Sequence, residues 1–187
     1  MDTFKRTFAA FVEIFEVAAI AVITVLLVRS YLVQPFLVNG ASMEPNFSNN
    51  NYLLVDELTY RLREPKRGEV IVFKYPGDES TFYIKRVIGL PGERIEVKDG
   101  IIKVYDDVNL NGLTIKENYL PSGLSTRGDS SVTLKDDEYY VMGDNRAYSF
   151  DSRSWGPLNK KELIGLVRLR LWPITKVSAF EAPEYSN

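Results

Sequence analysis

The sequence contains no cysteine and no histidine. The absence of cysteine excludes disulfides, thiol catalysis and thiolate metal sites. The absence of histidine excludes a Ser-His-Asp triad and every histidine-ligated metal site. Any hydrolytic chemistry in this chain must therefore use a base other than imidazole.

Strong charge of either sign is also missing, because the formal net charge is -2 over 187 residues. This balance gives no reason to expect a nucleic-acid partner. Hydrophobic residues make up 45% and charged residues 26% of the chain, a composition that predicts a packed core rather than disorder. The length suits one domain of ordinary size with an appendage.

The appendage is N-terminal, where a mostly apolar run extends from Phe8 to Val28. Lys5 and Arg6 precede this run and Arg29 follows it. A transmembrane helix needs ~20 predominantly apolar residues, so we predict a short cytoplasmic stub and a single-pass anchor within residues 1–30. Because basic residues stay cytoplasmic, the N-terminus is expected inside and the rest of the chain on the outer face of the cell membrane.

Two carboxylates, Glu13 and Glu16, interrupt the apolar run, and the anchor requires them to lie near headgroups, to be protonated or to be paired. Two other readings remain open. One is a cleaved signal peptide, although no small-x-small site follows Val28. The other is a buried helix of a soluble domain.

Short strands separated by glycine and proline turns follow the apolar run and predict a mainly β body of antiparallel sheets over residues 31–180. Asp99-Gly100 is a hairpin signal between two such strands. A short helix is expected at 159–162, and residues 181–187 are expected to form a loose tail. The expected strands are 36–38, 52–55, 70–75, 82–88, 94–98, 101–105, 139–142 and 166–171.

One serine, Ser42, lies among small residues directly after the first expected strand. A serine hydroxyl is a weak nucleophile that needs a base, and in this chain the candidates are Asp, Glu, Lys and Tyr. Lys85 lies inside an apolar strand, where burial would lower its pKa from ~10.4 toward neutrality. Arg86 faces the other way and cannot deprotonate, and Lys74 lies at the end of its strand, where solvation is easier. Taken singly, a turn serine and a solvated strand lysine remain the simpler explanations.

A third polar stretch, residues 143–153, contains two aspartates, two arginines and several small polar residues. It could form a loop of surface salt bridges, but its density favours an interlocked platform beside a site. The spacing matches no calcium loop, and Arg146 and Arg153 supply cations locally, so neither a metal nor a cofactor is expected.

Four segments resemble, in the same order, the motifs of bacterial type I signal peptidases, which are membrane-bound serine peptidases. The resemblance extends from about residue 31 to residue 172, with Glu69 at a position where Asp is commoner. It implies a signal-peptidase-like β fold whose partners are the lipid bilayer and the signal peptides of exported preproteins. The segments are 40–45, 67–73, 83–92 and 143–156.

The resemblance also implies catalytic roles. Ser42 would be the nucleophile and Lys85 the general base, with Ser149 orienting the lysine amine by a hydrogen bond. The backbone N–H of Ser42 would form the oxyanion hole. Gly40 stands where some relatives carry a serine, so a hydroxyl donor is missing there and a backbone N–H or water would replace it.

The remaining implied roles concern support and substrate binding. Asp144 and Arg153 would pair to brace the site, supported by Asn145 and Asp151. Small apolar pockets would take alanine-sized side chains at the first and third positions before the cut, from a substrate bound as an added strand. The implied pocket residues are Phe36, Val38, Tyr83 and Ile84.

Two alternatives use the same residues differently. Self-cleaving SOS repressors are also similar, because they use a Ser-Lys dyad on a β body, but they carry a DNA-binding domain rather than an apolar segment. A membrane-tethered β domain that only binds a partner would instead have Lys85 solvated and far from Ser42.

Overall fold

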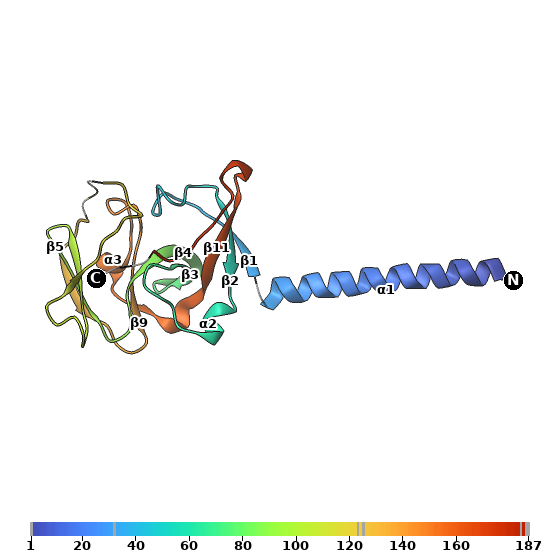
Figure 1. Ribbon diagram of the computed structural model, residues 1–187, viewed down its shortest axis with the longest axis horizontal. Helices are drawn as coiled ribbons and strands as arrows, with labels where there is room; N and C mark the ends of the chain where they lie inside the picture. The colour runs from blue at the N-terminus through green and yellow to red at the C-terminus, as the bar shows by residue number, and fades with distance from the viewer. Residues whose placement is uncertain (1, 32, 123, 125, 184, 186–187) are drawn as a thin grey trace.

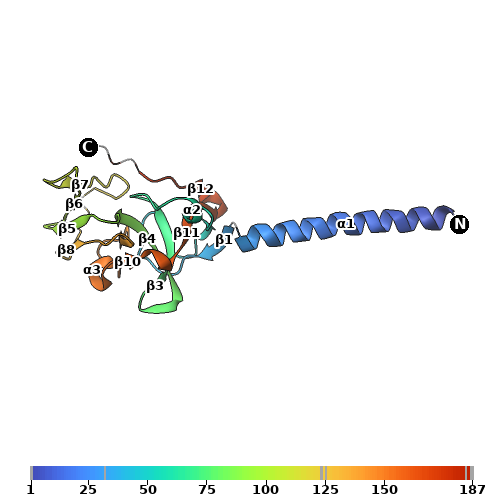
Figure 2. The ribbon, with the colours of Figure 1, turned by 90° about the horizontal axis from the view of Figure 1, so that it is seen from below.

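Helix α1 (Asp2–Tyr31) projects as a single rod from one end of a strand-rich body (Figures 1 and 2). Apolar side chains along it, including Phe11, Ile14 and Phe15, remain exposed. Of the helix residues whose side chains are described, no stretch is both long and apolar enough to cross a bilayer. The computed structural model describes residues 2–31, 33–122, 124, 126–183 and 185.

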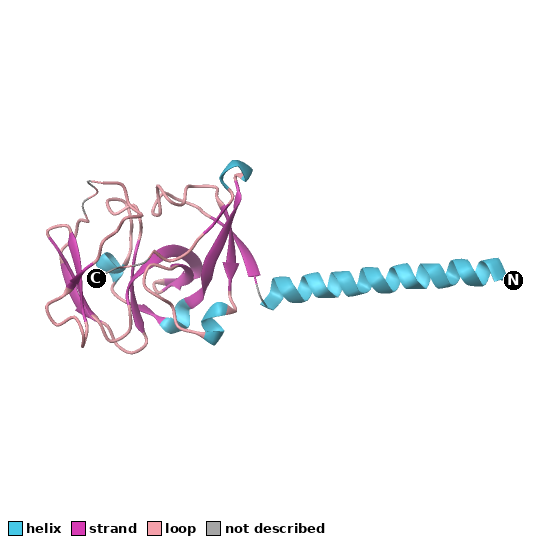
Figure 3. Cartoon of the chain, viewed as in Figure 1, coloured by secondary structure: helices cyan, strands magenta, loops and turns pink. Residues whose placement is uncertain are grey.

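The body is built mainly from strands, as predicted (Figure 3). Its larger sheet has the order β1-β2-β11-β3-β4-β9-β10, with β12 paired to β11, and its described pairings are antiparallel. These strands are β1 (Val33–Leu37), β2 (Tyr52–Asp56), β3 (Val70–Tyr75), β4 (Asp78–Gly89), β9 (Glu138–Met142), β10 (Leu158–Asn159), β11 (Leu163–Trp172) and β12 (Ser178–Ala179).

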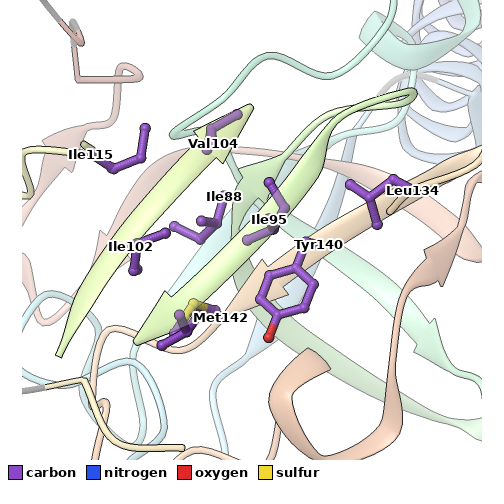
Figure 4. Close-up of a cluster of buried hydrophobic side chains, with 9 residues drawn as sticks. Ile88, Ile95, Ile102, Val104, Ile115, Leu134, Tyr140 and Met142 are labelled. Carbon is purple, nitrogen blue, oxygen red and sulfur yellow. The ribbon is translucent and has the colours of Figure 1, made fainter. Parts of the chain in front are cut away.

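The smaller sheet has the order β7-β6-β5-β8. Asp99 and Gly100 join β5 and β6 with φ values of 52° and 81°, the left-handed turn that this dipeptide predicts. Its inner face packs on β4 and β9 through a cluster that includes Ile88, Ile95 and Val104 (Figure 4). These strands are β5 (Arg94–Lys98), β6 (Ile101–Tyr105), β7 (Leu113–Thr114) and β8 (Ser130–Thr133).

Short helices connect the strands, and the helix expected at 159–162 is present as the 3-10 turn η1. In the tail, Tyr185 packs against the cluster of the smaller sheet. The expectation of a loose tail is therefore wrong for Tyr185, while residues 184, 186 and 187 lie outside the described residues. The short helices are α2 (Thr59–Leu62), α3 (Ser152–Trp155), η1 (Lys160–Glu162) and η2 (Ile174–Lys176).

Two further apolar clusters pack against the larger sheet. One lies beneath the turn that follows β1 and includes Met43, Phe47, Leu53 and Val72. The other packs the opposite side of β3 and β4 around Phe73. Side chains of β4 belong to two of the three clusters and pack against the third. This packing fixes the register of β4, so residues near its middle are held rigidly.

Candidate active site

The turn after β1 fixes the position of Ser42. Met43 and Phe47, which follow the serine, are buried in one apolar cluster, and the Phe47 N–H donates to the Met43 carbonyl at 2.9 Å. Gly40 precedes the serine with a φ of 106°, a conformation that glycine adopts without strain. These anchors leave the Ser42 hydroxyl facing a cleft.

Lys85 reaches the same cleft from the middle of β4. Its Nζ donates to Ser42 Oγ at 2.8 Å and to the Ile84 carbonyl at 2.9 Å, so the predicted contact with Ser42 is confirmed. The competing Lys74 instead lies opposite Phe82 in the β3–β4 ladder. Lys85 is only 3% exposed, which excludes the hypothesis of a solvated lysine far from Ser42.

The environment of Lys85 favours the neutral amine. Burial lowers the pKa of its ammonium to about 8, against the opposing charges of Asp151 and Asp144, which raise it. The amine also lies 5.1 Å from the centre of the Tyr83 ring. A lysine in this state carries an available lone pair at a pH where an ordinary lysine is almost fully protonated.

Asp144 pairs with Arg86 rather than with Arg153, so the pairing implied by the resemblance is wrong. The Arg86 Nε and Nη2 donate to the two Asp144 carboxylate oxygens at 2.8 and 2.7 Å. Arg86 follows Lys85 on β4 and points to the opposite face, where Asp144 is fully buried. A buried guanidinium needs a buried anion, and the loop after β9 supplies it. The Asn46 side chain adds a hydrogen bond to Asp144 at 2.8 Å.

Arg153 pairs with Asp151, two residues away on the same segment. Its Nε and Nη2 donate to the two Asp151 oxygens, each at 2.8 Å. Burial raises the pKa of Asp151, but the bonds from Arg153 outweigh it and hold the pKa below its usual value. Asp151 also accepts the Gly143 N–H at 3.0 Å, so this ion pair fixes the end of β9 next to the site.

Asn145 lies against the nucleophile turn, in agreement with a supporting position. Its backbone N–H donates to the Ser42 carbonyl at 3.1 Å, and its side-chain amide donates to the Ala41 carbonyl at 3.0 Å. The loop after β9 thus holds the backbone of the serine in place from one side.

Ser149 differs from its implied role. Its Oγ is buried, and the Lys85 amine instead donates to Ser42 Oγ and to the Ile84 carbonyl, so within the described part of the chain the expected bond from Ser149 to Lys85 is not formed. The hydroxyl lies against Gly143, where an added Cβ would collide with Ser149 Oγ and the Ser42 carbonyl. Only a glycine at 143 lets these segments approach so closely.

The expected oxyanion contribution of Gly40 is also corrected. The Gly40 N–H donates to the Asn49 side-chain oxygen at 2.9 Å, so this donor is already engaged. The Ser42 N–H is the remaining predicted donor from the turn.

The four predicted pocket residues meet in one cleft with the dyad. The cleft has a volume of about 680 Å³ and runs between the segment 36–42 and the N-terminal half of β4. Phe36 and Ile84 pack on the cluster beneath the nucleophile turn, and they form its apolar wall. The predicted residues that line it are Phe36, Val38, Tyr83 and Ile84.

The sequence argument missed several residues. Arg86 was considered only as a base, and its ion pair with Asp144 was not predicted. The sequence did carry a signal for this pair, because a charged residue directly after Lys85 in a buried strand points to the opposite face and needs a buried partner there. Arg146 is buried as well and forms an ion pair with Glu117 from a distant loop, a contact for which the sequence carries no local signal. In the described part of the chain, acidic residues form no cluster suited to a metal ion.

Comparison with known proteins places these features in context. The family described as "Signal peptidase, peptidase S26" matches residues 11–172. Signal peptidase I P of Bacillus subtilis subsp. natto is 35% identical over 187 residues, covering 94% of this chain and 97% of the relative. Signal peptidase I V of Bacillus subtilis strain 168 is 36% identical over 166 residues, covering 82% and 94%. A crystal structure of a signal peptidase I from Enterococcus faecalis is 28% identical, with a TM-score of 0.47, and covers 56% of this chain and 97% of that chain.

Proposed function

The chain belongs to the signal peptidase family, peptidase S26, and from that premise we propose that Ser42 and Lys85 are the catalytic dyad of its cleft. The protein is a type I signal peptidase, a serine endopeptidase that removes signal peptides from exported preproteins. This membership also sets aside the SOS-repressor alternative. The observation that carries the proposal is the 2.8 Å hydrogen bond from a buried lysine amine to the serine hydroxyl.

The neutral Lys85 amine takes the proton of Ser42 as Oγ attacks the carbonyl carbon of the residue before the cut. The lysine ammonium then gives that proton to the leaving amine, and an acyl-enzyme remains on Ser42. Water, activated by the same amine, releases the signal peptide and restores the hydroxyl. The Ser42 N–H stabilises the developing oxyanion.

Substrate binds as an extended segment between residues 36–40 and β4. β1 lies at the edge of the larger sheet, which supports addition of a substrate strand there. Phe36, Val38 and Ile84 form the apolar wall and narrow the cleft. Alanine-sized side chains therefore fit at the first and third positions before the cut. Alternate side chains of an extended chain point the same way, which accounts for the small-x-small pattern.

Membrane attachment is assigned to α1. Its exposed apolar side chains and its projection away from the body support this assignment, because no other part of the described protein covers them (Figure 1). Lys5 and Arg6 at its start support a cytoplasmic N-terminus with the body on the outer face. Protease added to the outside of inverted membrane vesicles, where the cytoplasmic face is exposed, tests this orientation. The body is expected to be protected, and its digestion would contradict the assignment.

The dyad is tested by Ser42→Ala and Lys85→Ala in the full chain. Each variant is expected to lose cleavage of an Ala-x-Ala preprotein while keeping the wild-type circular dichroism spectrum. Lys85→Arg serves as a matched control that keeps the charge and removes the base, and it is expected to be equally inactive. Near-normal turnover by any of the three variants would sink the assignment.

A further inference from the structure

The backbone of the nucleophile turn is held at two points. Asn145 bonds the Ala41 and Ser42 carbonyls at the start of the turn. Further along the turn, Arg170 Nη1 donates to the Asn46 carbonyl at 2.8 Å. Arg170 lies near the end of β11, a strand that contributes no residue to the cleft in the part of the chain that the structure describes. It therefore contacts the turn from outside the space where the substrate would bind.

All three guanidinium nitrogens of Arg170 form hydrogen bonds. Nε donates to the Lys176 carbonyl at 2.8 Å, and Nη2 donates to Ser178 Oγ at 3.0 Å. Nη1, besides its bond to the Asn46 carbonyl, reaches the Asn51 side-chain oxygen at 3.4 Å. Because the guanidinium is a rigid planar fork, acceptors on several sides fix its orientation. Arg170 therefore ties the nucleophile turn to the segment 176–180, which follows β11.

An aromatic contact supports the same link. The Phe180 ring lies 4.4 Å from the ring of Phe47, and the guanidinium carbon of Arg170 lies 5.3 Å from the centre of the Phe180 ring. Phe47 is fully buried within the turn. The Phe180 N–H donates to the Arg168 carbonyl at 2.9 Å, so β11 holds this ring in place. The turn is thus both packed and hydrogen-bonded on the side away from the cleft.

We propose that Arg170 is a positioning residue, which holds the Asn46 carbonyl and thereby fixes the distance from the Ser42 hydroxyl to the lysine amine. This inference deepens the proposed function and rests on it. Placement matters to the dyad, because a misplacement of about 1 Å can cost about 10²-fold in rate. Buried side chains hold the short turn between Ser42 and Asn46 rigid, so a shift at its far end is passed to the nucleophile.

The test compares Arg170→Met with the wild type, as full chains in detergent acting on an Ala-x-Ala peptide. Methionine keeps an unbranched apolar stem and removes every donor. The kcat is expected to fall by about ten- to a hundredfold and KM to stay within about twofold, because the cleft itself is unchanged. The pH at which kcat/KM levels off is expected to stay at about 8, since the surroundings of Lys85 are kept. A merely structural arginine would lower the melting temperature and leave the kcat of the folded protein unchanged.

Arg168→Met is the matched control. Arg168 lies two residues earlier on β11, and its side chain donates to Asp56 and Thr59 instead of the nucleophile turn. This variant is expected to keep the kcat and KM of the wild type. Arg170→Lys keeps the charge and one donor group, so it is expected to recover part of the kcat that Arg170→Met loses.

If Arg170→Met does not fold, Phe180→Leu tests the same link, with kcat expected to fall by about two- to tenfold at an unchanged KM. The proposal is overturned by a wild-type kcat in Arg170→Met where circular dichroism shows it folded, by a loss confined to KM, or by an equal loss in Arg168→Met. A wild-type kcat in Phe180→Leu overturns it where Arg170→Met is unfolded. Failure of the proposed function looks different, because it is cleavage that persists in Ser42→Ala.

Discussion

At the scale of single residues, Lys85 shows how a fold turns a common cation into a base. Its amine is buried, contacts the hydroxyl it is to deprotonate, and has a pKa lowered to about 8. Arg86, the next residue, has the pKa of its guanidinium raised by the partner Asp144 although burial alone lowers it. Two neighbouring basic side chains on opposite faces of one strand thus have pKa values shifted in opposite directions.

The pKa of Lys85 sets the expected pH dependence. Only the neutral amine accepts the serine proton, so kcat/KM for a short Ala-x-Ala peptide is expected to rise about tenfold per pH unit below about pH 8 and to level off above it. A steady-state pH profile from pH 6 to 9.5 measures this. A flat profile across that range would contradict lysine as the base.

Gly143 offers a second test at this scale. A methyl group there would meet Ser149 Oγ and the Ser42 carbonyl, and neither the buried hydroxyl nor the backbone can move freely. Gly143→Ala is expected to lower the free energy of unfolding by about 1–3 kcal/mol and to reduce kcat/KM by more than tenfold, because it displaces the nucleophile turn.

Gly92→Ala is the matched control for that change. Gly92 has a φ of 79° but open space around its Cα, in the turn that follows β4. Gly92→Ala is expected to lower the free energy of unfolding by about 1 kcal/mol through backbone strain. The kcat/KM of the folded protein is expected to stay unchanged. Equal kcat/KM values for the two variants would refute the steric role of Gly143.

The dyad was predictable from the sequence because it follows from elimination and strand periodicity. Without histidine or cysteine, Ser42 needed an unusual base, and the apolar strand around Lys85 supplied one. The pairings of Asp144, Asp151 and Arg153 were not predictable, because several anions and cations lie close together in sequence. Which of them meet depends on the packing of β4 against the loop after β9, and this packing is not encoded locally.

At the scale of elements, the junction between β4 and the loop after β9 organises the site. Lys85 and Arg86 leave β4 in opposite directions, the first toward Ser42 and the second toward Asp144. The same loop carries Asn145, which holds the carbonyls of the nucleophile turn. The Arg86–Asp144 ion pair therefore couples the strand of the base to the turn of the nucleophile.

Breaking this pair is expected to be costly. Asp144→Ala would leave the Arg86 guanidinium buried without its anion, which costs about 3–5 kcal/mol in the free energy of unfolding. The double variant Arg86→Met and Asp144→Leu is expected to recover much of the stability, since it removes both buried charges. Chemical denaturation monitored by tryptophan fluorescence measures both quantities.

An exposed pair provides the comparison on β9. Lys135 and Glu138 are bonded at 2.9 Å, but Lys135 is largely solvent-exposed. Glu138→Gln is expected to cost less than about 1 kcal/mol. A loss of similar size in Asp144→Ala would mean that the buried pair contributes no more than a surface contact.

Strand positions were the most predictable elements, because alternation and turn residues are local signals. The hairpin at Asp99-Gly100 was placed correctly, whereas β4 starts at Asp78, four residues before the expected 82. The extra length comes from pairing with β3, and such pairing is a tertiary property that overrides local composition.

At the scale of the whole molecule, the body and α1 are structurally separate. Among the residues whose side chains are described, none from α1 belongs to the three apolar clusters of the body, and these clusters give the body its own core (Figure 1). Such a core supports folding without the helix. With the membrane attachment proposed above, α1 would serve delivery, because it would hold the cleft near the membrane in which the substrate is also embedded.

Removal of residues 1–30 tests this division of roles. The truncated chain is expected to keep its melting temperature within a few degrees and its kcat/KM on a short Ala-x-Ala peptide within about threefold. Cleavage of a preprotein inserted in vesicles is expected to fall by about 10²-fold or more, because tethering enzyme and substrate to one surface raises their effective concentration. An unrelated apolar anchor in place of α1 should restore the rate. Full activity of the truncated chain on the vesicle substrate would show that α1 makes no contribution to delivery, and loss of peptide cleavage would show that the body depends on the helix.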